Sequence, residues 1–143
     1  LTPALAPVRI GSNISLIRSE VDLGSEQQLS TSARRPLQGQ SPYVVNVNAG
    51  YVSEDTGTEL TVLYNVFGPR ISEVGFNGLP DIYEQPFHRV DVTLVQKLNR
   101  NLRMKVSGIN LLNSASVFRQ QNTDVFKQWP GIAVNAQIEW SPL

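Results

Sequence analysis

The chain has 143 residues, 41% of them hydrophobic, and its 12 basic residues balance its 12 acidic residues. This balance gives no electrostatic footprint for nucleic acid, whose phosphates call for a clustered basic face, and the absence of cysteine excludes disulfides, thiolate zinc sites and a cysteine nucleophile. No run approaches the roughly 20 apolar residues of a membrane-spanning helix. Short membrane strands, in which only every second residue faces lipid, are not excluded.

Apolar and polar residues alternate with period two in six segments, which is the pattern of β-strands with two unlike faces. The alternation is cleanest in the last segment, and it is imperfect in the third, where Leu63 and Phe67 make the polar side less polar. In chain order, the predicted strands are 8–17, 43–52, 59–67, 87–98, 102–112 and 131–141. The sequence therefore predicts an all-β chain.

The charged residues of these segments all lie on the face opposite the apolar one. They are Arg9, Glu59, Arg89, Asp91, Lys97, Arg103, Lys105 and Glu139. A charge that faces lipid at mid-bilayer costs about 2–4 kcal/mol, whereas the lumen of a membrane barrel accepts polar groups. This phase predicts a transmembrane antiparallel β-barrel whose charges face an aqueous lumen.

Short and long connections alternate along the chain. The short ones are 53–58 and 98–101, and the long ones, rich in Gly, Pro, Asn, Gln and Ser, are 18–42, 68–86 and 113–130. Membrane barrels pair short periplasmic turns with long extracellular loops, and their known range starts at about 8 strands. We therefore expect residues 1–143 to be part of a larger barrel whose other strands come from the same protein or from another chain. A symmetric oligomer that contributes a few strands per subunit is the alternative.

Three stretches carry a resemblance to a known family. They are SPYVVNVNAGY (41–51), LTVLYNVFGPRI (60–71) followed by LPDIYEQPFHRVDVTLVQKL (79–98), and LRMKVSGINLLN (102–113) followed by a terminal strand. Their order and spacing resemble the C-terminal barrel end of TonB-dependent outer-membrane receptors. One departure is that family members often end on an aromatic residue, whereas here Ser141, Pro142 and Leu143 follow Trp140.

The resemblance implies a barrel of about 22 strands with a plugged lumen, located in the bacterial outer membrane and used for energised uptake of a scarce substrate. The implied partners are the N-terminal barrel and plug of the same receptor, TonB acting through the plug, and outer-membrane lipid or lipopolysaccharide. Nucleic acid, a cofactor, a metal and enzymatic activity are not expected.

Candidate substrate-binding residues lie in the long connections, because binding groups concentrate on loops held by a rigid scaffold. They are Arg70, Phe76, Asn77, Tyr83, Phe118, Arg119 and Trp129. Ordinary loop packing is the competing interpretation of each. A second group is a predicted lumen charge network, which would pair with the plug rather than with substrate, across the fourth and fifth strands: Arg89, Asp91, Lys97, Arg103 and Lys105.

Aromatic residues near strand ends predict contacts with lipid headgroups, although Tyr and Trp also suit any half-buried strand. They are Tyr43, Tyr51, Trp129 and Trp140, with Phe87 near the start of the fourth strand. Asn110 and Asn113 are expected to satisfy backbone groups where the fifth strand ends. His88 is the single histidine, and no partner for a catalytic or metal site stands near it.

Two other interpretations remain open at this point. The apolar faces would pack on one another in a soluble β-sandwich that serves as a binding module. A barrel of this kind could also host a hydrolase, but no Ser, His and Asp constellation is evident.

Overall fold

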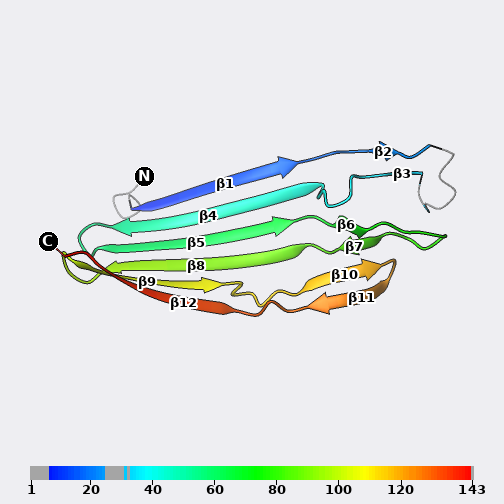
Figure 1. Cartoon of the computed structure of the whole chain (residues 1–143). Helices are drawn as coiled ribbons and strands as arrows, with labels where there is room; N and C mark the ends of the chain where they lie inside the picture. Colours follow the sequence, from blue (N-terminus) through cyan, green and yellow to red (C-terminus); the bar gives the residue numbers. More distant parts are fainter. Residues whose placement is uncertain (1–6, 25–30, 32, 143) are drawn as a thin grey trace.

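The computed structural model describes residues 7–24, 31 and 33–142 of the chain. All regular elements within these ranges are β-strands, so the prediction of an all-β chain is confirmed (Figure 1). No helix in the described ranges is long and apolar enough to cross a membrane.

Six long strands form the main sheet, in the order β1-β4-β5-β8-β9-β12, and every neighbouring pair is antiparallel. The sheet therefore follows the chain order, and the short strands between its members pair elsewhere. Its strands are β1 (Val8–Leu16), β4 (Tyr43–Ser53), β5 (Thr58–Phe67), β8 (Phe87–Lys97), β9 (Leu102–Ile109) and β12 (Ala133–Trp140).

Each of the six predicted segments corresponds to one strand of the main sheet. The largest difference is in 102–112, because β9 already ends at Ile109. Asn110 follows with a left-handed φ of 54°, a conformation that extended backbone cannot contain. A local asparagine turn therefore ends the strand three residues earlier than the apolar pattern indicates.

The register places like residues side by side across the whole sheet. One row of directly opposite residues runs through Val8, Tyr51, Leu60, Leu94, Val106 and Ala136. The next runs through Ile10, Ala49, Val62, Val92, Gly108 and Val134. We call the side of the sheet that carries these rows the apolar face and the other side the polar face.

The long connections are not irregular loops throughout, because each contains a short β-hairpin or strand pair. The strands are β2 (Val21–Asp22) with β3 (Arg34–Arg35), β6 (Arg70–Glu73) with β7 (Ile82–Glu84), and β10 (Ser116–Gln120) with β11 (Thr123–Gln128). β7 also pairs with β10, which joins two hairpins into one sheet of order β11-β10-β7-β6. These strands continue beyond one end of the main sheet, the hairpin end (Figure 1). The short turns lie at the opposite end, the turn end.

Very little of the chain is buried. Among the described residues, the buried hydrophobic side chains are Val66 and Ile71. On the apolar face, Ile10 is 77% exposed and Ile138 is 71% exposed. The accessible surface is 10176 Å², whereas a compact monomer of 15.8 kDa is expected to expose about 7,300 Å². Within residues 7–24, 31 and 33–142, no second layer therefore covers the main apolar surface.

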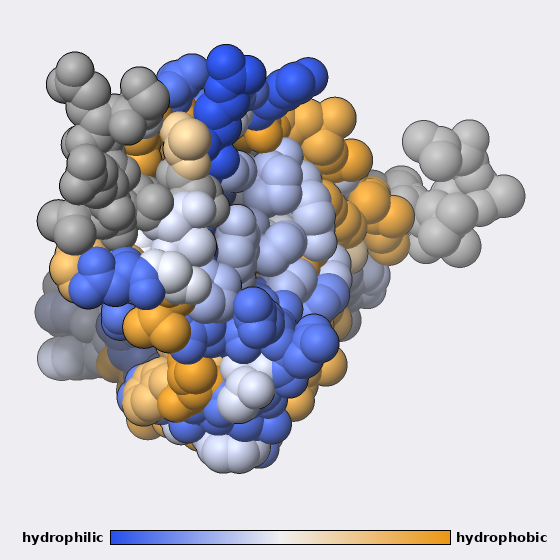
Figure 2. Space-filling model, turned by 90° about the vertical axis from the view of Figure 1, so that its right-hand side faces the viewer, coloured by the Kyte–Doolittle hydropathy of each residue, from blue (hydrophilic) through white to orange (hydrophobic). Residues whose placement is uncertain are grey.

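The two larger sheets lie end to end and not face to face (Figure 1). The described residues thus do not form the two packed layers of a β-sandwich. The main sheet is also not closed into a barrel, because β1 pairs only with β4 and β12 only with β9. In a view from the hairpin end, hydrophobic residues follow the right-hand outline and hydrophilic residues fill the middle (Figure 2).

Candidate functional site

The middle of the polar face is lined by neutral amides and hydroxyls. Asn13, Asn46 and Asn65 stand directly opposite one another on β1, β4 and β5, and Asn65 donates a hydrogen bond of 2.7 Å from Nδ2 to Oδ1 of Asn46. Thr93 of β8 lies between Thr61 and Ser107. Asn65 in turn stands opposite Arg89, and Arg9 lies at the β1 end of the row through Thr61 and Thr93. On β5, β8 and β9, the row of Thr61, Thr93 and Ser107 offers hydrogen bonds without a charge of its own.

Toward the hairpin end, the polar face holds one compact ion pair. Arg89 and Asp91 approach to 2.6 Å. The Oδ1 atom of Asp91 also accepts a hydrogen bond of 3.0 Å from the backbone N–H of Asn110. Asp91 is therefore occupied by its own strand neighbour and by the end of β9. It does not balance the basic residues farther along the sheet.

Toward the turn end, the polar face carries a cluster that is mainly basic. Arg103 donates a hydrogen bond of 2.9 Å to Glu139, and Lys97 stands directly opposite Arg103 in the register. Asp91 is six residues from Lys97 along β8, or roughly 20 Å. The expected network of five residues is therefore wrong as a single network: it consists of the pair Arg89 and Asp91 and a separate cluster with Lys97, Arg103 and Lys105.

Two adjoining cavities of about 310 and 430 Å³ lie over this second cluster and share Arg103 and Glu139. We call them together the basic hollow. Its lining residues are Glu59, Val95, Lys97, Asn99, Arg100, Asn101, Arg103, Lys105, Gln137, Glu139 and Ser141. The sequence places these charges on one face, but the register is needed to group them.

Arg70 does not point freely into solvent at the hairpin end. Its Nε donates a hydrogen bond of 2.7 Å to Glu84, and its guanidinium lies 4.3 Å from the centre of the Phe67 ring. Phe67 in turn stacks on Phe87 at 6.3 Å. This contact places Phe87 beside Phe67, on the polar face, so the expectation that Phe87 joins the headgroup aromatics is wrong. Phe87 and Arg89 are two residues apart in one strand, so the sequence alone indicates that both lie on the polar face.

Other predicted loop residues are also paired within the hairpins. Arg119 forms an ion pair of 2.7 Å with Asp124, the ring of Phe118 lies 5.6 Å from that of Phe126, and Lys127 lies over Trp129 at 4.7 Å. These contacts join the β10 and β11 strands or lie just after them. They support the packing interpretation for these residues.

Phe76 and Asn77 occupy the connection between β6 and β7. Phe76 is exposed, and Asn77 has a left-handed φ of 51°. An Asn is well suited to such a turn position because its short side chain tolerates this conformation. Neither residue lines a cavity with the other candidates, so the seven candidates do not converge on one site.

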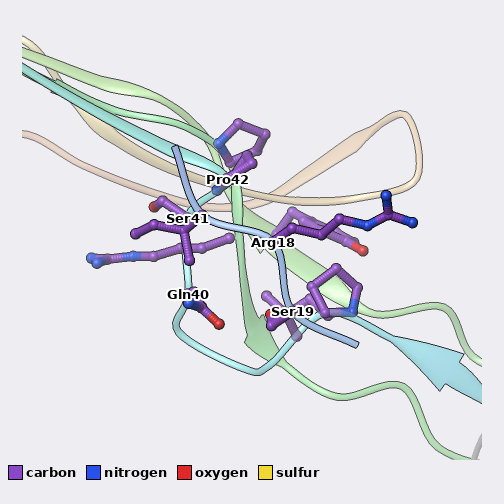
Figure 3. A pocket seen from close by; sticks show the side chains of 11 residues that line it. Arg18, Ser19, Gln40, Ser41 and Pro42 are labelled. Atoms are coloured by element: carbon purple, nitrogen blue, oxygen red, sulfur yellow. The ribbon is translucent and has the colours of Figure 1, made fainter. Parts of the chain in front are cut away.

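Two cavities at the hairpin end bring some of the candidates together. One, of about 270 Å³, is lined by Arg70 and Tyr83 together with residues that follow β1 and precede β4, including Arg18, Ser19, Gln40, Ser41 and Pro42 (Figure 3). The other, of about 530 Å³, is lined by Tyr83, Arg119, Gln85, Gln121 and Asn122 among others. Tyr83 is the candidate that lines both.

The hydroxyl of Tyr83 is held in its neutral form. Partial burial raises its pKa above the ordinary tyrosine value, and the negative charge of Asp81 raises this pKa further. Asp81 itself is buried and accepts a hydrogen bond of 2.6 Å from the backbone N–H of Gly75. The second cavity therefore offers the neutral hydroxyl of Tyr83 and the amides of Gln85, Gln121 and Asn122, beside the charged side chains of Asp81 and Arg119.

The remaining predicted aromatics lie near strand ends, and their contact with lipid headgroups stays a prediction. Tyr43 and Tyr51 stand near opposite ends of β4, Trp140 is the last residue of β12, and Trp129 lies between β11 and β12. Tyr64 was not foreseen. It accompanies His88, whose Nδ1 lies 2.8 Å from the Tyr64 hydroxyl oxygen. Within the described ranges, His88 belongs to no group of three or more potential metal ligands.

Asn110 organises the end of β9 as expected. It is 4% exposed. Its Nδ2 donates to the carbonyls of Ser114 and Gly131, and its Oδ1 accepts a hydrogen bond from the Ser114 N–H. Asn113, with φ of 49°, donates its backbone N–H to the Asn110 carbonyl. The role of Asn110 in satisfying backbone groups is confirmed, whereas the contact of Asn113 is made by its own backbone.

Comparisons of the chain with protein-family models, curated proteins and solved structures find no match.

Proposed function

We propose that this chain is the C-terminal barrel segment of a TonB-dependent receptor of the bacterial outer membrane, which takes up a scarce substrate with energy supplied through TonB. In this proposal, the apolar face contacts lipid and the polar face borders the lumen. The chain is a wall of the transporter and has no catalytic role.

The observation that carries the proposal is the composition of the apolar face. Its polar side chains are Ser12, Tyr43, Tyr51, Ser53, Thr58, Tyr64, His88 and Gln96, and no Asp, Glu, Lys or Arg stands on it in any of the six strands. A soluble protein has no reason to exclude charge from an exposed face. Lipid supplies that reason, because each charge at mid-bilayer costs about 2–4 kcal/mol.

Strand length and free edges support the same conclusion. The main strands have 8 to 11 residues, and a tilted membrane strand needs about 9–11. Each backbone amide left without a hydrogen bond at a sheet edge in lipid costs several kcal/mol. The edge strands β1 and β12 therefore require partner strands. The resemblance to TonB-dependent receptors in 41–113 supports upstream strands of the same receptor as these partners.

The lipid-facing assignment is testable on β8, because the chain has no cysteine. In the full-length receptor, single cysteines at Val90, Val92 and Leu94 would carry a fluorophore, with matched controls at Asp91, Thr93 and Val95. After reconstitution, brominated acyl chains should quench the first set and spare the second. Equal quenching of both sets would contradict the assignment of faces.

The receptor assignment needs a separate measurement. The full-length protein, extracted from outer membranes in detergent, should be retained by the immobilised periplasmic domain of TonB. A matched barrel protein without a plug serves as the control. Correct quenching without TonB retention would leave a membrane barrel but eliminate the TonB-dependent class.

A further inference from the structure

The basic hollow contains more positive charge than its own walls neutralise. Lys97, Arg100, Arg103 and Lys105 line it against two carboxylates, Glu59 and Glu139. Of the four basic groups, Arg103 has an ion pair with a described residue, at 2.9 Å from Glu139. Glu54 and Asp55 lie in the nearby β4–β5 turn but do not line the hollow. Two positive charges therefore remain in excess.

The register makes this arrangement unfavourable by itself. Lys97 and Arg103 are directly opposite each other on β8 and β9, and like charges in this position repel. Lys105 lies two residues from Arg103 on the same side of β9. In contrast, the pair of Arg89 and Asp91 near the hairpin end needs no additional partner. The repulsion at the turn end would be relieved by a bound anion.

We propose that the basic hollow is the docking surface for an acidic peptide segment, supplied by the part of the receptor that fills the barrel lumen. This inference rests on the proposed function, which makes the polar face the lumen wall. Its new content is the sign of the partner's charge and the place where the partner binds.

The shape of the hollow favours a peptide over a small anionic substrate. The cations lie in successive rows, at Lys105, then at Lys97 and Arg103, then at Arg100 in the β8–β9 turn. Residues two apart on a strand are about 7 Å apart, so the charges extend along the wall and do not converge on one point. An extended segment with spaced carboxylates matches this pattern, and neutral amides and hydroxyls farther up the face can bond its backbone.

The chain offers a direct chemical test, because two of its three lysines, Lys97 and Lys105, line the hollow. The full-length receptor in isolated outer membranes would be treated with a water-soluble carbodiimide, which joins a lysine amine to a carboxylate in contact with it. Peptide mass spectrometry would then identify the partners. The third lysine, Lys127 on β11, reports access of the reagent and is the matched control.

We expect Lys97 or Lys105 to couple to an Asp or Glu of the same receptor outside residues 1–143, and the coupling to be lost in K97Q or K105Q respectively. Coupling only to Glu59 or Glu139, coupling to a different protein, or no coupling at Lys97 and Lys105 although the amine of Lys127 forms an amide with an activated carboxylate would each overturn the inference. If the receptor still passes the quenching test, each of these outcomes leaves the proposed function intact.

A charge exchange supplies the second measurement. The double variant K97E/K105E should lower the amount of receptor that assembles with a protease-resistant lumen domain. Replacing the identified carboxylate residue by lysine should restore it. Failure of this reversal, with K97Q/K105Q assembling normally, would show that the hollow does not hold the segment.

Discussion

The six long strands and the hairpins beyond them are held together in different ways. In the main sheet, whole rows of interchangeable apolar residues lie opposite one another, as at Val62, Val92 and Gly108. At the hairpin end, individual contacts decide the structure, among them the ion pair of Arg70 with Glu84 and the hydrogen bonds of Asn110. The main sheet should therefore tolerate replacement of one apolar residue by another, but not by a charged one. In the hairpin region, replacement of a residue that makes a specific contact should destabilise the structure even when its polarity is kept.

The strongest test of this difference is a charge on the apolar face. Under the proposed function, in which Val92 faces lipid and Thr93 the lumen, Val92→Arg should cost about 2–4 kcal/mol relative to Thr93→Arg. The measurement is urea unfolding of the receptor in lipid vesicles, together with the amount of heat-modifiable protein in outer membranes. Val92→Leu should be nearly neutral. Equal losses for both arginine variants would remove the distinction between the faces.

A smaller effect is expected where β9 ends. Asn110→Ala removes three side-chain hydrogen bonds from a buried site and places a Cβ-bearing residue without a polar side chain at φ of 54°. We expect a loss of roughly 2–3 kcal/mol in the free energy of unfolding. Asn113 also has a left-handed φ, but its side chain is exposed. Asn113→Ala should therefore lower the free energy of unfolding by only about 1 kcal/mol. The same urea experiment compares them, and equal losses would assign the effect to φ alone.

The smallest expected effect concerns Tyr83 at high pH. The pKa of Tyr83 is raised in the folded chain, so its protonated hydroxyl stabilises the fold. This contribution is complete below the unfolded tyrosine pKa of about 10 and is lost as pH rises through the folded pKa. Difference absorbance between the wild type and Tyr83→Phe measures this titration. Asp81→Asn should lower the pKa part of the way toward its ordinary value. An unshifted titration in the wild type would contradict burial of the hydroxyl.

The main sheet was predictable because alternation is a local property. Each strand's two faces can be assigned from its own residues, and antiparallel neighbours follow from short turns such as 98–101. The role of Asn110 was also predictable, since asparagine favours left-handed turn positions.

The hairpins and the grouping of charges were not predictable in this way. β6 and β7 have 4 and 3 residues, too few to show a period. The pairing of Arg70 with Glu84 depends on how two segments align, and so does the pairing of Arg103 with Glu139 across β9 and β12. The five charges were expected to form one network because their proximity in the sequence does not show that six residues along β8 separate Asp91 from Lys97.

The neutral stretch of the polar face, with Asn46 hydrogen-bonded to Asn65 and Thr93 between Thr61 and Ser107, has a kinetic consequence under the proposed function. A solute that moves along β5, β8 and β9, from the row of Asn65 and Arg89 to the basic hollow, crosses the uncharged row of Thr61, Thr93 and Ser107 and exchanges one weak hydrogen bond for another there. Its dwell time on the wall would then depend little on ionic strength, and slow release would have to arise at the hairpin or turn end.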